Sequence, residues 1–150
     1  MSGEQTGSYA GKWWLTIGAL FGFASVALGA FGAHGLKTSL RERDLSPQEQ
    51  TQRLDNWEVA ARYQMYHGLA LIAVGLLAGH RPRRLWSAAA AAFTVGGLIF
   101  SGCLYAYVLS GAKPWALIVP VGGVLLLLGW LSFLLAVLLP PASAAAARGR

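Results

Sequence analysis

Four long stretches without a charged residue constrain this chain more than any other feature of its sequence. Asp, Glu, Lys and Arg are absent from residues 13–36, 63–79, 85–112 and 114–147. A run of about 20 apolar residues, each rising roughly 1.5 Å along a helix, crosses the hydrocarbon core of a bilayer. A soluble domain has about a quarter charged residues, whereas this chain is 12% charged and 55% hydrophobic. The sequence therefore predicts an integral membrane protein.

The predicted fold class is all-α, an integral membrane four-helix bundle with a short amphipathic helix in the first loop. A single four-span membrane domain is expected over residues 12–139. We place its transmembrane helices at about 13–36, 60–79, 85–109 and 115–139. Pro140 and Pro141 stop the last helix because neither can donate an amide hydrogen bond. Residues 1–11 and 140–150 are expected to be disordered.

The first loop is the only long polar segment of the sequence. Its residues 46–49 (Ser-Pro-Gln-Glu) have the pattern of a capping box with proline at the first helical position. Leu54, Trp57 and Ala61 then recur at i, i+3 and i+7, which predicts an amphipathic helix over about 47–60 that lies on the membrane surface and runs into the second span. We expect Trp57 at the interface, with its indole N–H in water. The same is expected of the tryptophans that open the other spans, Trp13, Trp14, Trp86 and Trp115.

The net charge of +6 does not indicate a nucleic-acid partner, because the basic residues stand at the ends of the apolar stretches, where they meet lipid headgroups. The second loop places three arginines within residues 80–84, whereas the first loop dilutes its five basic residues with five acids. The positive-inside rule then favours a bacterial inner (plasma) membrane protein with both termini in the cytoplasm. The expected partners are membrane lipids and either another membrane protein or a second copy of this chain.

Glycines form stripes on the first two predicted spans. At 100° per residue, those of the first span share one narrow face, and those of the second repeat the pattern. Small residues let two helix backbones approach closely in lipid. We therefore predict that these glycines pack helices within one chain, in preference to a homodimer contact. The predicted packing residues are Gly18, Gly22, Gly29, Gly32, Gly68, Gly75 and Gly79.

The few polar side chains inside the predicted spans gather in the half of the bundle next to the first loop. A polar or ionisable group in the bilayer is costly and marks a site by default. The cluster predicted as a binding candidate consists of His34, Tyr63, Gln64, His67, Ser101, Cys103 and Tyr105. His34 and His67 could ligate a haem or a metal. No intramembrane carboxylate accompanies them, so a hydrogen-bonded network that locks the helices is favoured, and no cofactor is predicted.

Catalytic residues are not expected, because the spans contain no Asp or Glu for general acid–base chemistry. The single cysteine cannot form an intramolecular disulfide or, alone, a zinc site. We therefore expect a non-enzymatic accessory, assembly or lipid-associated structural protein. One alternative is a haem- or metal-binding redox protein that uses His34 and His67. Another is a small transporter, whose cargo would be neutral or lipid-like because no charge lies inside the membrane.

Four motifs, in order along the chain, resemble a known family. They are residues 29–36 (GAFGAHGL), then Trp57, Ala60, Tyr63, Gln64, His67 and residues 69–71, then residues 100–105 (FSGCLY), and finally Pro120, Gly122, Gly123, Gly129 and Trp130. Over most of residues 15–135 the chain is similar to the YgdD-like small inner-membrane family, the domain of unknown function 423, which has mitochondrial relatives of the transmembrane protein 256 type. The resemblance implies a four-helix bacterial inner-membrane protein and no settled activity. Cys103 and Val119 stand where that family usually has serine and threonine, which weakens any hydrogen-bonding role at these positions.

Overall fold

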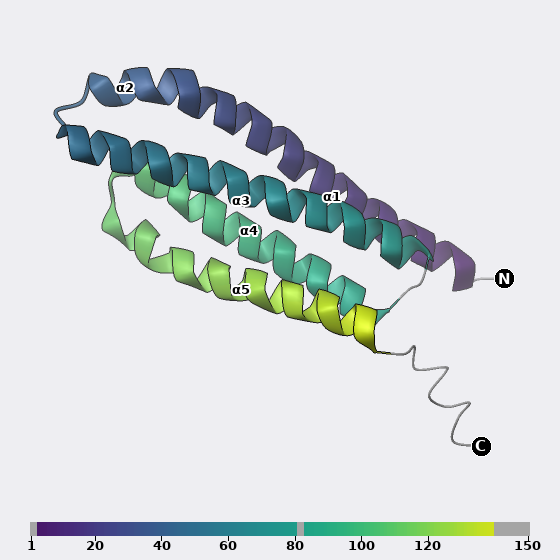
Figure 1. Cartoon of the computed structure of the whole chain (residues 1–150). Helices are drawn as coiled ribbons and strands as arrows, with labels where there is room; N and C mark the ends of the chain where they lie inside the picture. Colours follow the sequence, from purple (N-terminus) through teal and green to yellow (C-terminus); the bar gives the residue numbers. More distant parts are fainter. Residues whose placement is uncertain (1–2, 81–82, 140–150) are drawn as a thin grey trace.

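A computed structural model of this chain describes residues 3–80 and 83–139, and helices make up nearly all of them (Figure 1). The helices are α1 (Gly3–Phe31), η1 (Gly32–Leu36), α2 (Lys37–Arg41), α3 (Pro47–His80), α4 (Arg84–Ser110) and α5 (Lys113–Leu138). η1 is a single stretch of π-helix, and it joins α1 to α2 without a gap. No strand occurs within the described residues, which confirms the all-α prediction.

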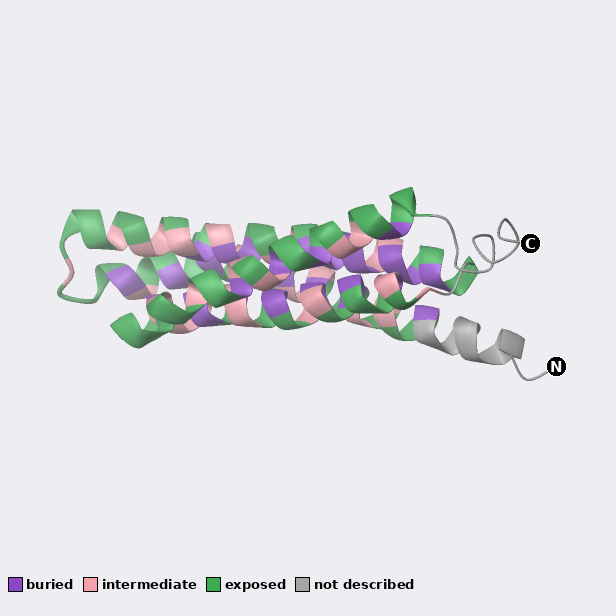
Figure 2. Ribbon diagram, turned by 90° about the horizontal axis from the view of Figure 1, so that it is seen from below, coloured by how far each residue is buried: buried purple, intermediate pink, exposed green. Residues whose placement is uncertain are grey.

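The four long helices lie side by side in sequence order (Figure 1). α1 packs on α3, α3 on α4 and α4 on α5, so that α3 and α4 occupy the middle of the row. Large apolar side chains are exposed on the outer helices; Phe23 of α1 is 76% exposed and Leu117 of α5 is 78% exposed (Figure 2). Such a surface is typical of a protein whose surroundings are apolar.

Three segments are long and apolar enough to cross a membrane: Gly11–Arg41, Arg84–Ser110 and Lys113–Leu138. α3, which contains the second predicted span, is not among them. Its uncharged part includes Tyr63, Gln64 and His67, which lower its hydropathy. Length and composition therefore support three of the four predicted spans.

Local signals set several of the helix ends. The Ser46 Oγ accepts a hydrogen bond from the Glu49 backbone N–H at 3.3 Å, and the Ser46 N–H donates to Glu49 Oε2 at 3.2 Å, which confirms the predicted capping box. α4 ends at Ser110 and is capped by Gly111, whose φ of 73° lies in the left-handed region that favours glycine. α5 continues through Pro120 without a break.

The helical segments differ from the predicted boundaries near the first loop and at the N-terminus. α1 begins at Gly3, so its backbone includes most of the segment 1–11 that was predicted to be disordered. Residues 140–150 lie outside the described part of the chain. The predicted surface helix at about 47–60 and the predicted second span form one continuous helix, α3.

Trp57 and Trp86 are buried, and the expectation that their indole N–H groups face water is wrong. Trp57 is 3% exposed, and its Nε1 donates to the carbonyl of Leu28 at 2.7 Å. Trp86 is 5% exposed, and its Nε1 has no hydrogen-bond partner among the described residues. Both indoles pack between helices, Trp57 against the rings of Phe31 and Tyr105 and Trp86 against the ring of Phe133.

Glycines bring backbones into contact between α1 and α3 and between α4 and α5. A Cβ on Gly18 would lie 2.7 Å from the carbonyl oxygen of Gly68, and a Cβ on Gly122 would lie 2.5 Å from the backbone N of Phe100. No real Cβ fits at such distances, so each of these contacts requires a residue without a side chain.

The predicted packing glycines divide into two groups. Gly18, Gly68 and Gly75 lie in the α1–α3 contact, and Gly32 lies against the indole of Trp57. Gly22 is looser, since a Cβ there would meet only the Met65 Sδ, at 3.9 Å. A Cβ on Gly29 or Gly79 would meet no heavy atom within 4 Å, so both side-chain positions border open space, although the backbone of Gly79 lies 3.2 Å from where a Cβ on Gly11 of α1 would be.

Candidate functional site

Two serines hold α3 from both sides at one level. Ser25 of α1 donates to the carbonyl of Ala61 at 2.7 Å, and Ser101 of α4 donates to the carbonyl of Ala60 at 2.9 Å. Both serines are buried. Both hydroxyls therefore have a hydrogen-bond acceptor on the backbone of α3. Polar groups inside helix contacts in lipid are usually paired in this way.

Tyr105 and Gln64 form a second polar link between α4 and α3. The Tyr105 hydroxyl donates to Gln64 Oε1 at 2.9 Å. The Tyr105 ring also packs on Trp57, with 4.5 Å between the ring centroids. Gln64 and Tyr105 are therefore engaged with each other across the α3–α4 contact.

His67 is buried and uses both ring nitrogens. Its Nδ1 lies 2.7 Å from the carbonyl oxygen of Tyr63, and its Nε2 lies 3.3 Å from the Nε1 of Trp130. The indole N–H can only donate, so Nε2 must be the acceptor and Nδ1 must carry the hydrogen. With these two partners, His67 is assigned as a neutral imidazole that carries its hydrogen on Nδ1.

Aromatic rings surround this histidine. Phe93 and Trp130 have ring centroids 5.5 Å and 6.2 Å from that of His67. Tyr63 stacks on Phe100 with 4.8 Å between the centroids. The histidine is thus enclosed by side chains from α3, α4 and α5 whose rings offer an apolar surface.

An open groove of about 640 Å³ lies beside these rings, between α3 and α5. The residues that line it are Tyr63, Tyr66, His67, Phe100, Pro120, Gly123, Val124, Leu126, Leu127 and Trp130. On α5 the groove extends from Pro120 to Trp130, which is the middle of a helix that runs from Lys113 to Leu138. None of the ten lining residues is Asp, Glu, Lys or Arg.

The structure brings together part of the predicted polar cluster. Tyr63 and His67 line the groove, while Gln64, Ser101 and Tyr105 form the hydrogen bonds between α3 and α4. Cys103 is buried in α4 and does not line the groove. His34 is exposed on η1.

His34 and His67 lie far apart along the antiparallel pair of α1 and α3. Gly32 faces Trp57 and Gly18 faces Gly68, so some fourteen residues, or about 20 Å of helix, separate the two histidines. One haem iron or metal ion cannot reach both. Within residues 11–80 and 83–139, no three His, Cys, Asp or Glu side chains gather as a metal site.

Trp130 and Phe93 belong to the site but were not predicted as site residues. The sequence held a signal for Trp130, since it lies well inside the last apolar stretch, whereas membrane tryptophans concentrate at the two interfaces. A tryptophan at this depth needs an acceptor for its N–H, and His67 provides it.

The family model described as "Protein of unknown function (DUF423)" matches residues 28–123. The chain belongs to this family. A UPF0382 membrane protein of Staphylococcus aureus is 39% identical over 125 residues, which cover 83% of this chain and 94% of the relative. A UPF0382 membrane protein of Haemophilus influenzae is 39% identical over 120 residues, which cover 79% of this chain and 88% of the relative. No solved structure matches the chain.

The membership confirms the resemblance that the four motifs predicted. A further UPF0382 membrane protein, from Staphylococcus epidermidis, is 38% identical over 128 residues, or 85% of this chain and 96% of the relative. The family is described as one of unknown function, so the activity has to be argued from the site.

Proposed function

We propose that this protein is a non-enzymatic membrane protein that spans the bilayer four times and holds a neutral, lipid-like molecule in the groove between α3 and α5. The observation that carries the proposal is the groove itself, an apolar cavity beside the middle of α5, a helix that is long and apolar enough to span a bilayer. A cavity at that depth opens towards lipid tails.

The fourth crossing is assigned to α3. Residues 63–79 have no charged side chain, and at 1.5 Å per residue they cover about 25 Å, close to the thickness of the hydrocarbon core. α3 also packs between α1 and α4, both of which are apolar enough to span. The charged first part of α3, from Pro47 to Arg62, then extends beyond the hydrocarbon core to the membrane surface.

Both termini are assigned to the cytoplasmic side of a bacterial inner membrane. The arginines of the compact second loop support this orientation through the positive-inside rule. Single cysteines introduced at Ser110 or His80, in a Cys103→Ser background, test it with a thiol reagent that does not cross the membrane. Labelling of the cysteine at 110 in whole cells is expected; labelling of the cysteine at 80 instead would reverse the topology.

The chemistry of the groove selects a neutral occupant. Burying an ionised group without a partner is expensive, and no side chain in the groove offers an opposite charge. The Nε1 of Trp130 donates to the Nε2 of His67, so these two groups are already paired. The hydroxyls of Tyr63 and Tyr66 are the polar groups of the lining residues that remain to bond to an occupant. These features fit an isoprenoid, quinone-like or diacylglycerol-like molecule with one hydroxyl or carbonyl group.

A groove-filling substitution tests the proposal. In Gly123→Leu the new side chain enters the groove, and its Cβ meets the Phe100 ring at ordinary contact distance, 3.9 Å. Gly102→Leu is the matched control, because a Cβ at Gly102 meets no heavy atom within 4 Å and the residue does not line the groove. Leu127→Trp fills the same groove from a different position.

Native mass spectrometry with lipid analysis of protein purified in mild detergent provides the measurement. The wild type and Gly102→Leu are expected to retain a neutral lipid-like molecule. Gly123→Leu and Leu127→Trp are expected to retain about tenfold less, equivalent to about 1.4 kcal/mol of binding free energy. Absence of any such molecule from the wild type, or equal retention by both groove variants, would rule the function out.

A further inference from the structure

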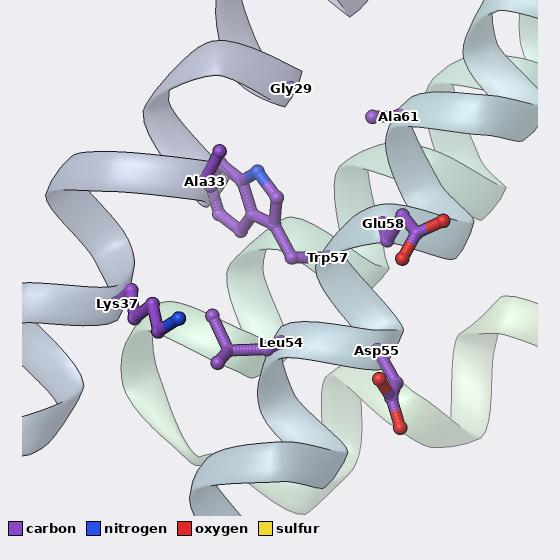
Figure 3. A pocket seen from close by; sticks show the side chains of 9 residues that line it. Gly29, Ala33, Lys37, Leu54, Asp55, Trp57, Glu58 and Ala61 are labelled. Atoms are coloured by element: carbon purple, nitrogen blue, oxygen red, sulfur yellow. The ribbon is translucent and has the colours of Figure 1, made fainter.

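A second cavity, of about 420 Å³, lies between the α1–η1–α2 rod and α3, near the first loop (Figure 3). It is lined by Gly29, Gly32, Ala33, Lys37, Leu54, Asp55, Trp57, Glu58 and Ala61. Figure 3 shows Lys37 on one side, Asp55 and Glu58 on the other, and the indole of Trp57 between them. Unlike the groove between α3 and α5, this pocket has charges of both signs.

Two of these charges have no ionic partner within the described residues. Glu58 is paired with Arg62 at 3.0 Å. Lys37 and Asp55 form no ion pair, either with each other or with another described residue. The pocket therefore presents one ammonium group and one carboxylate that are available to a ligand from opposite sides.

The pocket lies at the boundary between apolar and charged sequence. Gly29, Ala33 and Ala61 form its apolar part, and Lys37 is the first charged residue after the uncharged stretch 13–36. In the four-span arrangement proposed above, this is the level at which acyl chains meet headgroups. Gly29 keeps the apolar part open, since no heavy atom lies within 4 Å of the place where its Cβ would be.

We infer that this pocket binds a membrane phospholipid whose headgroup carries both a phosphodiester and a primary ammonium, the phosphoethanolamine type. Lys37 binds the phosphate and Asp55 accepts hydrogen bonds from the ammonium, since charge-assisted bonds of this kind are the strong ones. The first methylenes of the lipid lie along Gly29, Ala33 and the ring of Trp57. The Trp57 N–H already donates to the carbonyl of Leu28, so Trp57 offers its ring, and not its N–H, to the pocket.

The same geometry discriminates against the other common headgroups. A quaternary choline group has no N–H to donate to Asp55. A purely anionic headgroup binds Lys37 but faces the carboxylates of Asp55 and Glu58 without a cation to match them. Of these three kinds of headgroup, only phosphoethanolamine satisfies both sides of the pocket.

The test offers the full-length, delipidated protein an equimolar mixture of phosphatidylethanolamine, phosphatidylcholine and phosphatidylglycerol, and counts the bound lipids by native mass spectrometry. The wild type is expected to prefer phosphatidylethanolamine about fivefold over each competitor. Asp55→Asn removes the preference over phosphatidylcholine, Lys37→Gln lowers retention of phosphatidylethanolamine, and Gly29→Leu abolishes its binding by filling the pocket. Asp44→Asn, Lys113→Gln and Gly102→Leu make the same changes outside the pocket and should behave as the wild type.

Three results would overturn the inference. The first is equal binding of phosphatidylethanolamine and phosphatidylcholine to the wild type, and the second is a preference that survives both Asp55→Asn and Lys37→Gln, two exposed positions where folding is not at risk. The third is full competition by soluble phosphoethanolamine, which would show that the pocket takes a small polar solute instead of a lipid. Neutral-lipid retention in the α3–α5 groove is measured in the same spectra, so failure of one site does not hide the other.

Discussion

The two outer pairs of helices have close backbone contacts that the central contact lacks among the described residues, whereas a serine hydroxyl bonds to α3 from both α1 and α4. α1 with α3, and α4 with α5, meet backbone to backbone through glycines such as Gly18, Gly68 and Gly122. α3 and α4 meet through side-chain hydrogen bonds, from Ser101 to a backbone carbonyl and from Tyr105 to Gln64. The protein thus consists of two tightly packed helical pairs that are joined by a polar contact.

This difference explains where the groove lies. The glycine contacts hold α1 against α3 and α5 against α4, and they leave no room for a ligand at the level of Gly18, Gly68 and Gly122. α3 and α5 are on either side of α4, and the space above Phe100 between them is filled only partly by rings. The groove therefore lies over the contact between the two pairs, where α3 and α5 do not touch backbone to backbone.

Gly18→Leu should have the largest effect, because it attacks a backbone contact. Its Cβ would lie 2.7 Å from the Gly68 carbonyl oxygen and 2.9 Å from the Ile72 backbone N, and neither atom can move unless the helices separate. We expect a loss of about 3 kcal/mol in the free energy of unfolding, at the upper end for overpacking, measured by SDS titration in mixed micelles. Gly102→Leu is the control, and a Gly18→Leu protein as stable as that control would mean that α1 and α3 do not meet through glycine.

Ser101→Ala should have a smaller effect, because it removes one hydrogen bond and leaves the backbones in place. The Ala60 carbonyl keeps its helical partner, so we expect a loss of about 0.6–1 kcal/mol in the same titration. Ser132→Ala is the control, since the Ser132 hydroxyl bonds only within its own helix, to the carbonyl of Leu128. A loss as large as that of Gly18→Leu would remove the distinction between the two kinds of contact.

Tyr105→Phe should have the smallest effect of the three. It removes the bond to Gln64 but keeps the ring on Trp57, and the half-buried amide can turn to other partners. A loss of about 0.5 kcal/mol is expected. Tyr107→Phe, a half-buried tyrosine with no hydrogen bond to a described residue, is the matched control. No difference between the two variants would show that Tyr105 contributes to the contact by packing alone.

The features that the sequence predicted well are those set by local physics. The capping box at Ser46 and Glu49 depends on neighbouring residues. The glycine face shared by Gly18 and Gly68 follows from helical periodicity. Periodicity does not predict where two helices separate. Gly29 has the same periodicity but lies at an open pocket instead of a helix contact.

The features that the sequence did not predict depend on the length of α3 and on long-range pairing. α3 begins at Pro47, so His67 lies about 30 Å along it, far from the first loop where His34 stands. The hydrogen bond between His67 and Trp130 joins residues 63 positions apart, and no local sequence pattern predicts it. Trp57 was expected in water because the depth of the surrounding helices could not be known from the charges alone.

Arginines in or next to the first and second loops also donate hydrogen bonds to carbonyl groups at the ends of α4 and α5. Arg53 donates to the carbonyl of Val108 at 3.2 Å and Arg43 to that of Leu109 at 2.9 Å, at the end of α4. Arg83 donates to the carbonyls of Ala136 and Leu139 at the end of α5. Three of the charges that the positive-inside rule counts, Arg43, Arg53 and Arg83, therefore bond to carbonyl groups in the folded chain. Replacing Arg83 with lysine would keep the positive charge that acts during insertion. It would lose the two hydrogen bonds that the planar guanidinium makes to the end of α5. One substitution can therefore separate the role of Arg83 in insertion from its role in holding α5.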